Sequence, residues 1–251
     1  MDETALKHEI CSVDGRTYGG SQMLSDNKNI RKCGCGVAAA ADLLIYLHRY
    51  HSPLGCPLLK ALPEEGAIPI ADYRRLLAWL SRRFFPLIPS KGINGVMLAA
   101  GLDLFMRLYG GEMTALWCFT GGKLWQRCED MLRRDIPVIF SVGANFPKIW
   151  GRERLRLYTK LPDGTFRPSG SVRAHFMTAT ALDDTHIRVS SWGRMYYISR
   201  GEFDEYVKKH SGSIICNIVY IKQTLKNHVL KSDNRAAGEL EGARPASNWI
   251  N

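Results

Sequence analysis

Apolar residues recur at helical spacing in the first half of the chain and in short runs in the second half. From residue 36 to about 50, a run of alanines is followed by Leu43, Leu44 and Leu47, and a proline and a glycine lie just beyond. Alanine favours helices, and proline and glycine end them. This pattern predicts a helix over 36–50. The same spacing predicts three more helices, at 71–84, 94–109 and 123–134.

Beyond residue 134 the apolar runs are short, as is typical of strands. The run 137–142 predicts a buried strand. Pro162-Asp163-Gly164 predicts the turn of a hairpin between 155–160 and 165–167. Further strands are expected at 175–182, 187–191, 195–198 and 213–221. Helices followed by strands indicate an α+β fold.

The length and the ends of the chain suggest one domain with a polar extension. A chain of 251 residues suits one domain, which we expect over 1–222, with 223–251 as a weakly ordered polar tail. No run reaches the roughly 18–20 apolar residues that a membrane helix needs. The first residues also lack the basic and apolar segments of a secretory signal. A cytoplasmic location is therefore expected.

The formal net charge of +10 raises the question of nucleic-acid binding. However, the basic residues are dispersed in pairs such as Arg74-Arg75 and Arg82-Arg83, and no basic block is interleaved with aromatic residues. We expect a solvated basic surface and no specific nucleic-acid binding, with acidic partners as the alternative. Seven irregularly spaced cysteines argue against a disulfide framework.

The chemistry of the chain centres on Cys35, which lies between two glycines at the start of the first predicted helix. Unpaired N–H groups and the positive end of the helix dipole stabilise a thiolate at such a place, so we expect a lowered thiol pKa. The alternative is a small buried residue with no reactivity. A thiol nucleophile needs a base, and His175 at the head of a predicted buried strand is the candidate. By itself, His175 would read as an ordinary imidazole at a strand end.

Three further side chains could complete the site. Gln22 could donate an amide N–H to an oxyanion, together with the backbone N–H of Cys35. Ser190, or its neighbour Ser191, could accept the other N–H of the histidine, although a serine orients an imidazole only weakly. Trp192 could cover that hydrogen bond. Each of these residues could equally belong to a turn or to the core.

A zinc site is a rival interpretation of the same cysteines. Cys33 and Cys35 are followed by His48 and His51, as in a zinc finger. The gaps within both pairs are too short, and a continuous helix between them, about 18 Å long at 1.5 Å per residue, would hold the pairs apart. We therefore expect neither a metal nor a cofactor.

Taken together, these motifs resemble the papain-like cysteine peptidases, and most closely their bacterial C39-like branch. Gln22, the segment around Cys35, and His175 with its apolar neighbours fit that family in order and spacing. The segment 131–139 is similar to the family's helix leading into a Pro-Val-Ile strand, and 190–193 is similar to an Asn-Ser-Trp-Gly motif. The resemblance covers roughly residues 18 to 220. It implies a helical N-terminal half packed on a C-terminal antiparallel sheet.

The resemblance also implies cleavage of a peptide or amide bond through an acyl-enzyme, with a peptide or protein as substrate. Two features depart from the family: Ser190 stands where Asn or Asp is usual, and Gln22 lies 13 positions before Cys35, farther than is usual. Two alternatives stay open. The same site could transfer an acyl group to an amine, or the chain could be a binding module that has lost efficient catalysis.

Overall fold

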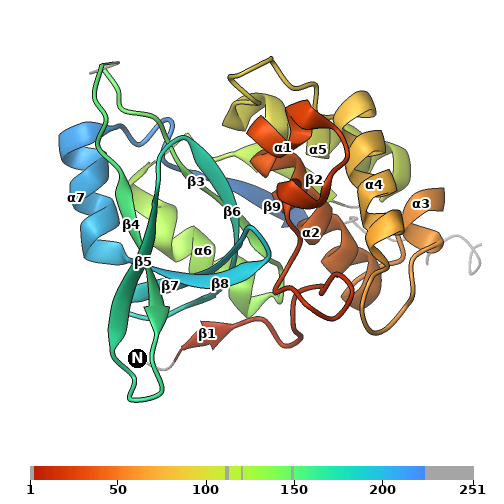
Figure 1. Cartoon of the computed structure of the whole chain (residues 1–251), viewed down its shortest axis with the longest axis horizontal. Helices are drawn as coiled ribbons and strands as arrows, with labels where there is room; N and C mark the ends of the chain where they lie inside the picture. Colours follow the sequence, from red (N-terminus) through yellow and green to blue (C-terminus); the bar gives the residue numbers. More distant parts are fainter. Residues whose placement is uncertain (1–2, 111–112, 120, 148–149, 224–251) are drawn as a thin grey trace, which may run out of the picture.

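The structure is a computed structural model that describes residues 3–110, 113–119, 121–147 and 150–223. Most of its helices lie in the N-terminal half, and Figure 1 shows α1 to α5 gathered on one side of the molecule. Two helices, α6 and α7, come later in the chain. The helical elements are η1 (Gln22–Leu24), α1 (Lys28–Cys33), α2 (Cys35–Tyr50), α3 (Pro57–Lys60), α4 (Ile70–Arg83), α5 (Gly95–Tyr109), η2 (Gly121–Lys123), α6 (Leu124–Arg133) and α7 (Arg200–His210).

The strands form one antiparallel sheet in the order β2-β9-β3-β6-β7-β8-β4-β5, and the short β1 also pairs with β6. The sheet and the N-terminal helices confirm the predicted α+β class. The strands are β1 (Thr4–Ala5), β2 (Met113–Trp117), β3 (Val138–Val142), β4 (Leu155–Lys160), β5 (Phe166–Val172), β6 (His175–Leu182), β7 (His186–Ser191), β8 (Arg194–Ser199) and β9 (Ile218–Gln223).

Several elements differ from the sequence prediction. The helices α1, α3 and α7 and the strand β2 were not predicted. The last strand starts at Ile218 rather than at 213, because the preceding residues turn: the Asn217 amide donates to the Ser213 carbonyl, and Cys216 N–H donates to Gly212. The helix α7 was missed because only Phe203 and Tyr206 are buried on it. Of the predicted tail, only the end of β9 lies within the described residues.

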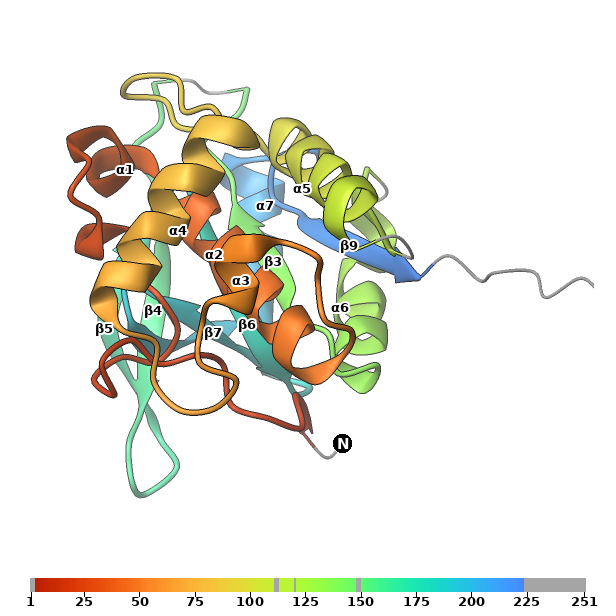
Figure 2. The same ribbon diagram turned by 90° about the vertical axis from the view of Figure 1, so that its right-hand side faces the viewer.

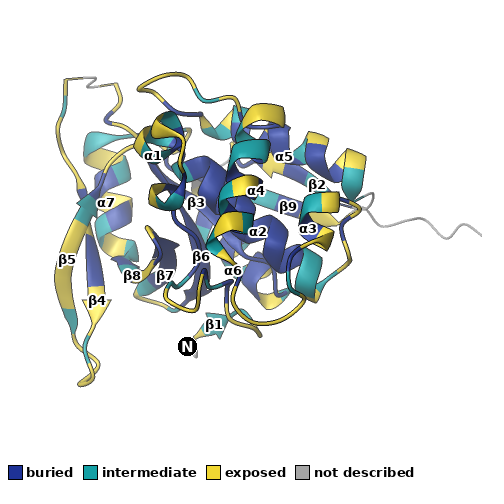
Figure 3. Ribbon diagram, turned by 45° about the vertical axis from the view of Figure 1, so that its right-hand side comes forward, coloured by how far each residue is buried: buried dark blue, intermediate teal, exposed yellow. Residues whose placement is uncertain are grey.

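Helix α2 packs against the middle of the sheet and positions the candidate site. It contacts β6 and β3 on one side and α4 and α5 on the other, and Figure 2 shows it in front of β3 and β6. Every residue from Gly36 to Leu47 is buried, as the dark colour of α2 in Figure 3 shows. The small side chains of its alanine run let backbone elements approach from both sides. Its apolar surface thus holds the helix against the sheet through burial of nonpolar area.

The far side of the sheet is covered by α6 and α7. Their aromatic rings meet on the sheet, where Trp125 of α6, Phe140 of β3 and Phe203 of α7 lie within 4.8 to 5.9 Å of one another, centre to centre. None of the helices in the described part of the chain is long and apolar enough to cross a membrane.

Candidate active site

Cys35 is the first residue of α2, as predicted, and its two glycine neighbours are required by close contacts. Gly34 ends α1 and begins α2: its N–H donates to Ile30 O, and its carbonyl accepts from Ala38 N–H. A Cβ at Gly34 would lie 2.6 Å from the Ile30 carbonyl oxygen. A Cβ at Gly36 would lie 2.9 Å from Ile93 and 3.3 Å from the Phe176 ring. Gly34 therefore allows α1 to run directly into α2, and Gly36 lets the first turn of α2, with its thiol, lie against Phe176 at the start of β6.

His175 is the first residue of β6, next to Phe176, and its side chain is buried. Its Nε2 lies 2.7 Å from the hydroxyl of Ser191, the last residue of β7. The indole of Trp192 stacks on the imidazole with ring centres 4.5 Å apart. The tautomer that donates from Nε2 to Ser191 leaves the lone pair on Nδ1. The ring is thus held on one edge and one face, with Nδ1 available as a base.

The turn that carries Ser191 and Trp192 has a tightly defined backbone. Trp192 and Gly193 connect β7 to β8 and have positive φ angles of 51° and 73°. Two consecutive residues with positive φ are the signature of a type I′ hairpin turn, whose twist matches that of the flanking strands. A positive φ is unfavourable for a bulky residue such as Trp192, and a glycine would adopt it without strain. This turn presents the indole beside the imidazole, with 37% of the tryptophan surface still exposed.

The structure corrects the assignment of the orienting residue by one position. The hydroxyl of Ser190 does not contact His175; it donates to the Tyr18 carbonyl at 2.8 Å. Successive residues of a strand point to opposite faces, so a shift of one residue exchanges the two environments. Ser191 therefore contacts the imidazole, the role that the Asn-Ser-Trp-Gly motif predicted for Ser190. Ser190 instead binds the N-terminal segment at Tyr18.

Gln22 reaches the same site from the N-terminal segment, although it lies 13 positions before Cys35 in sequence. It belongs to η1, is buried, and donates from Nε2 to Arg31 O at 3.1 Å. The intervening residues fold back as α1, whose N-cap Asn27 accepts from the N–H groups of Asn29 and Ile30. A short helix thus turns the chain back, so that Gln22 lines the same cavity as Cys35 despite their separation in sequence.

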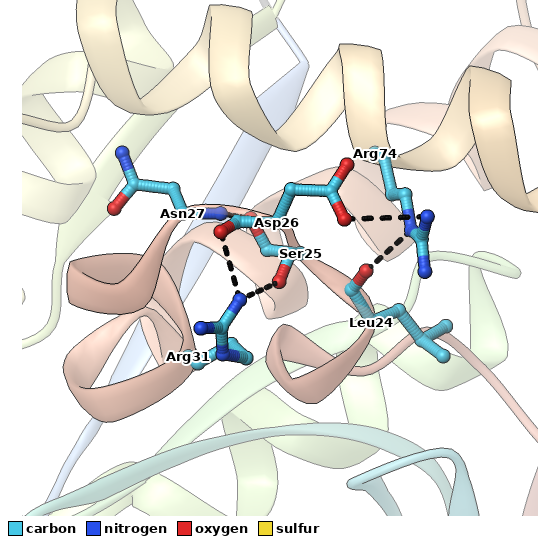
Figure 4. A network of polar contacts seen from close by, with 6 residues as sticks. All are labelled: Leu24, Ser25, Asp26, Asn27, Arg31 and Arg74. Carbon is cyan, nitrogen blue, oxygen red and sulfur yellow. Dashed lines mark hydrogen bonds and ion pairs between the residues drawn. The ribbon is translucent and has the colours of Figure 1, made fainter.

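A polar network fixes this fold-back segment, as Figure 4 shows. The Arg31 guanidinium donates to the carbonyls of Ser25 and Asp26, both at 2.8 Å. From α4, Arg74 donates to Leu24 O at 2.7 Å and pairs with the Asp26 carboxylate at 3.2 Å. These contacts hold the end of η1 between α1 and α4, and so they limit the movement of Gln22.

Cys35, His175, Gln22, Ser191 and Trp192 all line one narrow cavity. The room inside is small, about 10 Å³ for the centre of a water molecule, which is close to the minimum for one water. The thiol makes no hydrogen bond to the imidazole among the described residues. Catalytic contacts are often long before substrate binds, so the pairing of Cys35 with His175 as nucleophile and base stays a prediction.

The thiol of Cys35 and the imidazole of His175 are both uncharged at neutral pH. Burial lowers the pKa of His175 to about 4, and the positive charge of Arg154 adds to the effect. Burial also raises the pKa of the Cys35 thiol, and backbone hydrogen bonding at Phe176, Gly36 and Cys35 offsets only part of this rise. The expected lowering of the thiol pKa by the helix N-terminus is therefore outweighed by desolvation. Thiol and imidazole rest as an uncharged pair.

The residues of the rival zinc pattern are engaged elsewhere. The Cys33 thiol donates to Asn29 O at 3.1 Å, His48 Nδ1 accepts from Leu54 N–H, and His51 Nε2 lies 2.7 Å from Asp135 O. Within the part of the chain that the structure describes, no group of three or more His, Cys, Asp or Glu side chains could hold a metal.

One residue of the cavity wall, Asp42, was missed by the sequence analysis. It lies on α2, seven positions after Cys35, and is buried. Burial raises the pKa of this carboxyl to about 7, against the hydrogen bond from Gly20 N–H that lowers it. The sequence did contain a signal for Asp42, which is the single carboxylate within the apolar, alanine-rich part of a predicted helix. A buried charge needs polar partners, so a carboxylate at such a position indicates specific contacts.

Comparisons with protein-family models, with curated proteins and with solved structures gave no significant match. The papain-like resemblance therefore rests on the residues quoted above.

Proposed function

We propose that this chain is a thiol-dependent hydrolase of the papain-like type, which cleaves a peptide or amide bond through Cys35 and His175. The observation that carries the proposal is that a thiol at a helix start and a histidine at a strand start line the same cavity. A nucleophile beside a base that is itself held by a third group is the general arrangement of covalent hydrolases.

In the proposed reaction, Cys35 Sγ attacks the substrate carbonyl carbon while His175 Nδ1 takes the thiol proton. The imidazolium then gives this proton to the leaving amine, the C–N bond breaks, and a thioester remains on the sulfur. His175 next removes a proton from water, which attacks the thioester carbonyl; the C–S bond breaks, the acid is released, and the imidazolium returns the proton to the Cys35 sulfur. Ser191 positions the imidazole through Nε2.

The developing oxyanion would be stabilised by two donors. One is the backbone N–H of Cys35. The first N–H groups of a helix have no carbonyl acceptor within that helix, so this N–H has none within α2. The other is Gln22 Nε2, which carries two hydrogens and uses one for Arg31 O. Such donors contribute about 3–4 kcal/mol to transition-state stabilisation in other hydrolases.

Two observations favour a second candidate, a binding module with weak catalysis. The group that orients the imidazole is a neutral serine, and the thiol pKa is raised rather than lowered. A module of this kind would bind a peptide in the same cavity and cleave it slowly or not at all.

The test is digestion of a proteome-derived peptide library, with cleavage products identified by mass spectrometry. We expect the wild type to generate new termini, and Cys35→Ala and His175→Ala to lose this activity. Cys33→Ala is the matched control, because it removes a neighbouring thiol and should leave cleavage intact. A second arm adds a primary amine such as glycinamide, and products that form only in its presence would identify acyl transfer.

Cleavage that survives Cys35→Ala would overturn the assignment of the nucleophile. Binding of library peptides without cleavage by the wild type would support the binding module instead.

A further inference from the structure

The buried carboxyl of Asp42 joins the chain segments that carry the parts of the candidate site. The backbone N–H of Gly20 donates to both of its oxygens, at 2.9 and 3.1 Å. From α4, Tyr73 Oη donates to Oδ1 at 3.4 Å, and from the N-terminal segment the Cys11 thiol does so at 3.5 Å. One side chain of α2 thus contacts both the segment that leads to Gln22 and helix α4.

The segment beside Asp42 fits only because two glycines occupy it. A Cβ at Gly19, where φ is +71°, would lie 2.0 Å from Ser190 Oγ and 2.9 Å from an Asp42 oxygen. A Cβ at Gly20 would lie 1.7 Å from Tyr73 Oη. The backbone therefore passes close to the carboxyl, with no side chain between them, and the Gly20 N–H points at it.

The same glycine also holds the hairpin turn that faces His175. Gly20 O accepts from Gly193 N–H at 3.0 Å, and Gly193 O accepts from Tyr18 N–H at 3.0 Å. Gly193 belongs to the turn that carries Ser191 and Trp192. Gly20 thus connects Asp42 to this turn, with its N–H bound to the carboxyl and its carbonyl bound to Gly193 N–H.

From this geometry we infer that Asp42 is a positioning residue of the candidate active site, which holds Gln22 and the Ser191–Trp192 turn in place through Gly20. The inference rests on the proposed function for its effect on turnover, whereas its structural part stands independently. Asp42 and Cys35 lie on the same helix, seven residues apart, so the carboxyl fixes these two segments relative to the thiol.

A carboxylate suits this task because its bond to a backbone N–H is charge-assisted and stronger than a neutral one. An asparagine has one side-chain oxygen, so it could accept a single bond from the Gly20 N–H, and that bond would be weaker because the amide is uncharged. An alanine could accept none. The contribution of residue 42 should therefore decrease from aspartate to asparagine to alanine.

The test compares Asp42→Asn and Asp42→Ala with the wild type at pH 8, where the carboxyl, with its pKa near 7, is ionised. Asp135→Asn is the matched control: it too is a buried carboxyl that binds α2, through Tyr46 Oη at 2.5 Å, but near the other end of the helix. The first readout is hydrogen–deuterium exchange of segments 18–22 and 190–194. The second is kcat and KM on a peptide found in the library screen.

We expect exchange in both segments to accelerate severalfold in Asp42→Asn and more in Asp42→Ala, with no such change in Asp135→Asn. The value of kcat should fall about tenfold in Asp42→Ala and less in Asp42→Asn, while KM changes little. Should Asp42→Ala not fold, Asp42→Asn decides alone.

Exchange in 18–22 and 190–194 within twofold of the wild type in Asp42→Asn would overturn the inference, whatever the activity. Accelerated exchange with unchanged kcat would overturn the catalytic part and leave only a structural role. If the wild type cleaves no peptide, the proposed function fails, and exchange still decides whether Asp42 holds the two segments.

Discussion

Ser191 Oγ lies 2.7 Å from His175 Nε2, so the residue at the end of β7 holds the imidazole at the start of β6. In the proposed mechanism, this bond leaves Nδ1 as the nitrogen that takes a proton from Cys35. Its neighbour in sequence, Ser190, binds the Tyr18 carbonyl instead. Two adjacent serines thus have separate tasks, and they can be tested separately.

Replacement of Ser191 by alanine should lower kcat by about tenfold at most, because a neutral hydrogen bond contributes about 0.5–1.5 kcal/mol. Ser190→Ala, the matched control, should reduce the melting temperature, because it leaves the Tyr18 carbonyl without its donor, and should affect kcat less. Steady-state kinetics and thermal unfolding of both variants provide the measurement. A larger loss of kcat in Ser190→Ala, at equal folded fraction, would contradict these roles.

The pH dependence of activity should reflect the low pKa of His175. A general base must be unprotonated, and burial lowers the pKa of His175 to about 4. In Asp42→Asn, where the carboxyl with its pKa near 7 no longer titrates, we therefore expect kcat/KM to stay constant as pH falls from 8 to about 5 and to decline with a midpoint near 4. A decline centred near 6.5, with the protein still folded by circular dichroism, would show that the imidazole is solvated during turnover.

The same pKa predicts a loss of stability in acid. The pKa of His175 is about 4 in the folded state and near its usual 6.5 when unfolded, so the unfolded state binds more protons between these values. Above pH 6.5 the imidazole is neutral in both states, so its titration does not change the free energy of unfolding. Below pH 6.5 this free energy falls, and at pH 4 it is lower by about 3 kcal/mol. His175→Gln should lack this contribution. Urea unfolding of both proteins at pH 7 and pH 4 measures the difference, and equal pH dependence would contradict it.

Alkylation of Cys35 should report a half-buried, neutral thiol. Because burial raises its pKa above that of an ordinary thiol, the rate of reaction with iodoacetamide should still be rising at pH 9. Peptide mapping of the wild type across pH 6 to 10 follows the residue directly. A plateau reached below pH 7 would indicate a thiolate already formed at neutral pH, as the sequence alone suggested.

A methyl group at Gly36 should separate the thiol from β6. Alanine has a higher helix propensity than glycine by about 1 kcal/mol, but its Cβ would lie 2.9 Å from Ile93 and 3.3 Å from Phe176, and overpacking costs about 1–3 kcal/mol. Gly36→Ala should therefore lower both melting temperature and kcat. Gly201→Ala on α7 is the control, since its Cβ would meet only Ser199 Oγ at 3.9 Å, and it should be neutral or stabilising. A Gly36→Ala variant with unchanged kcat would contradict the need for close packing.

Local patterns predicted the parts of the site that depend on local structure. The alanine run predicted the helix that begins at Cys35, and the apolar run after His175 predicted β6. Both predictions were possible because helix and strand periodicity depend on residues that are close together in the sequence. That these two elements meet came only from the family resemblance, since packing between distant segments leaves no local pattern.

The features of the site that were not predicted depend on contacts between segments that are distant in the sequence. The choice between Ser190 and Ser191 depends on the register at the end of β7, where one residue exchanges the two faces of the sheet. The role of Asp42 depends on Gly20, which is 22 positions away in the chain. The helices α1 and α7 have few buried positions, so their apolar spacing was too weak to predict them.

A covalent acyl intermediate on Cys35 is the species that distinguishes the proposed hydrolase, and acid quenching during turnover of a peptide ester should trap it. Thioesters survive the quench, so digestion and mass spectrometry can locate the adduct. We expect an acyl group on Cys35 in the wild type and none in Cys35→Ala, with Cys33→Ala like the wild type. An adduct on another residue, or turnover with no adduct on Cys35, would contradict it.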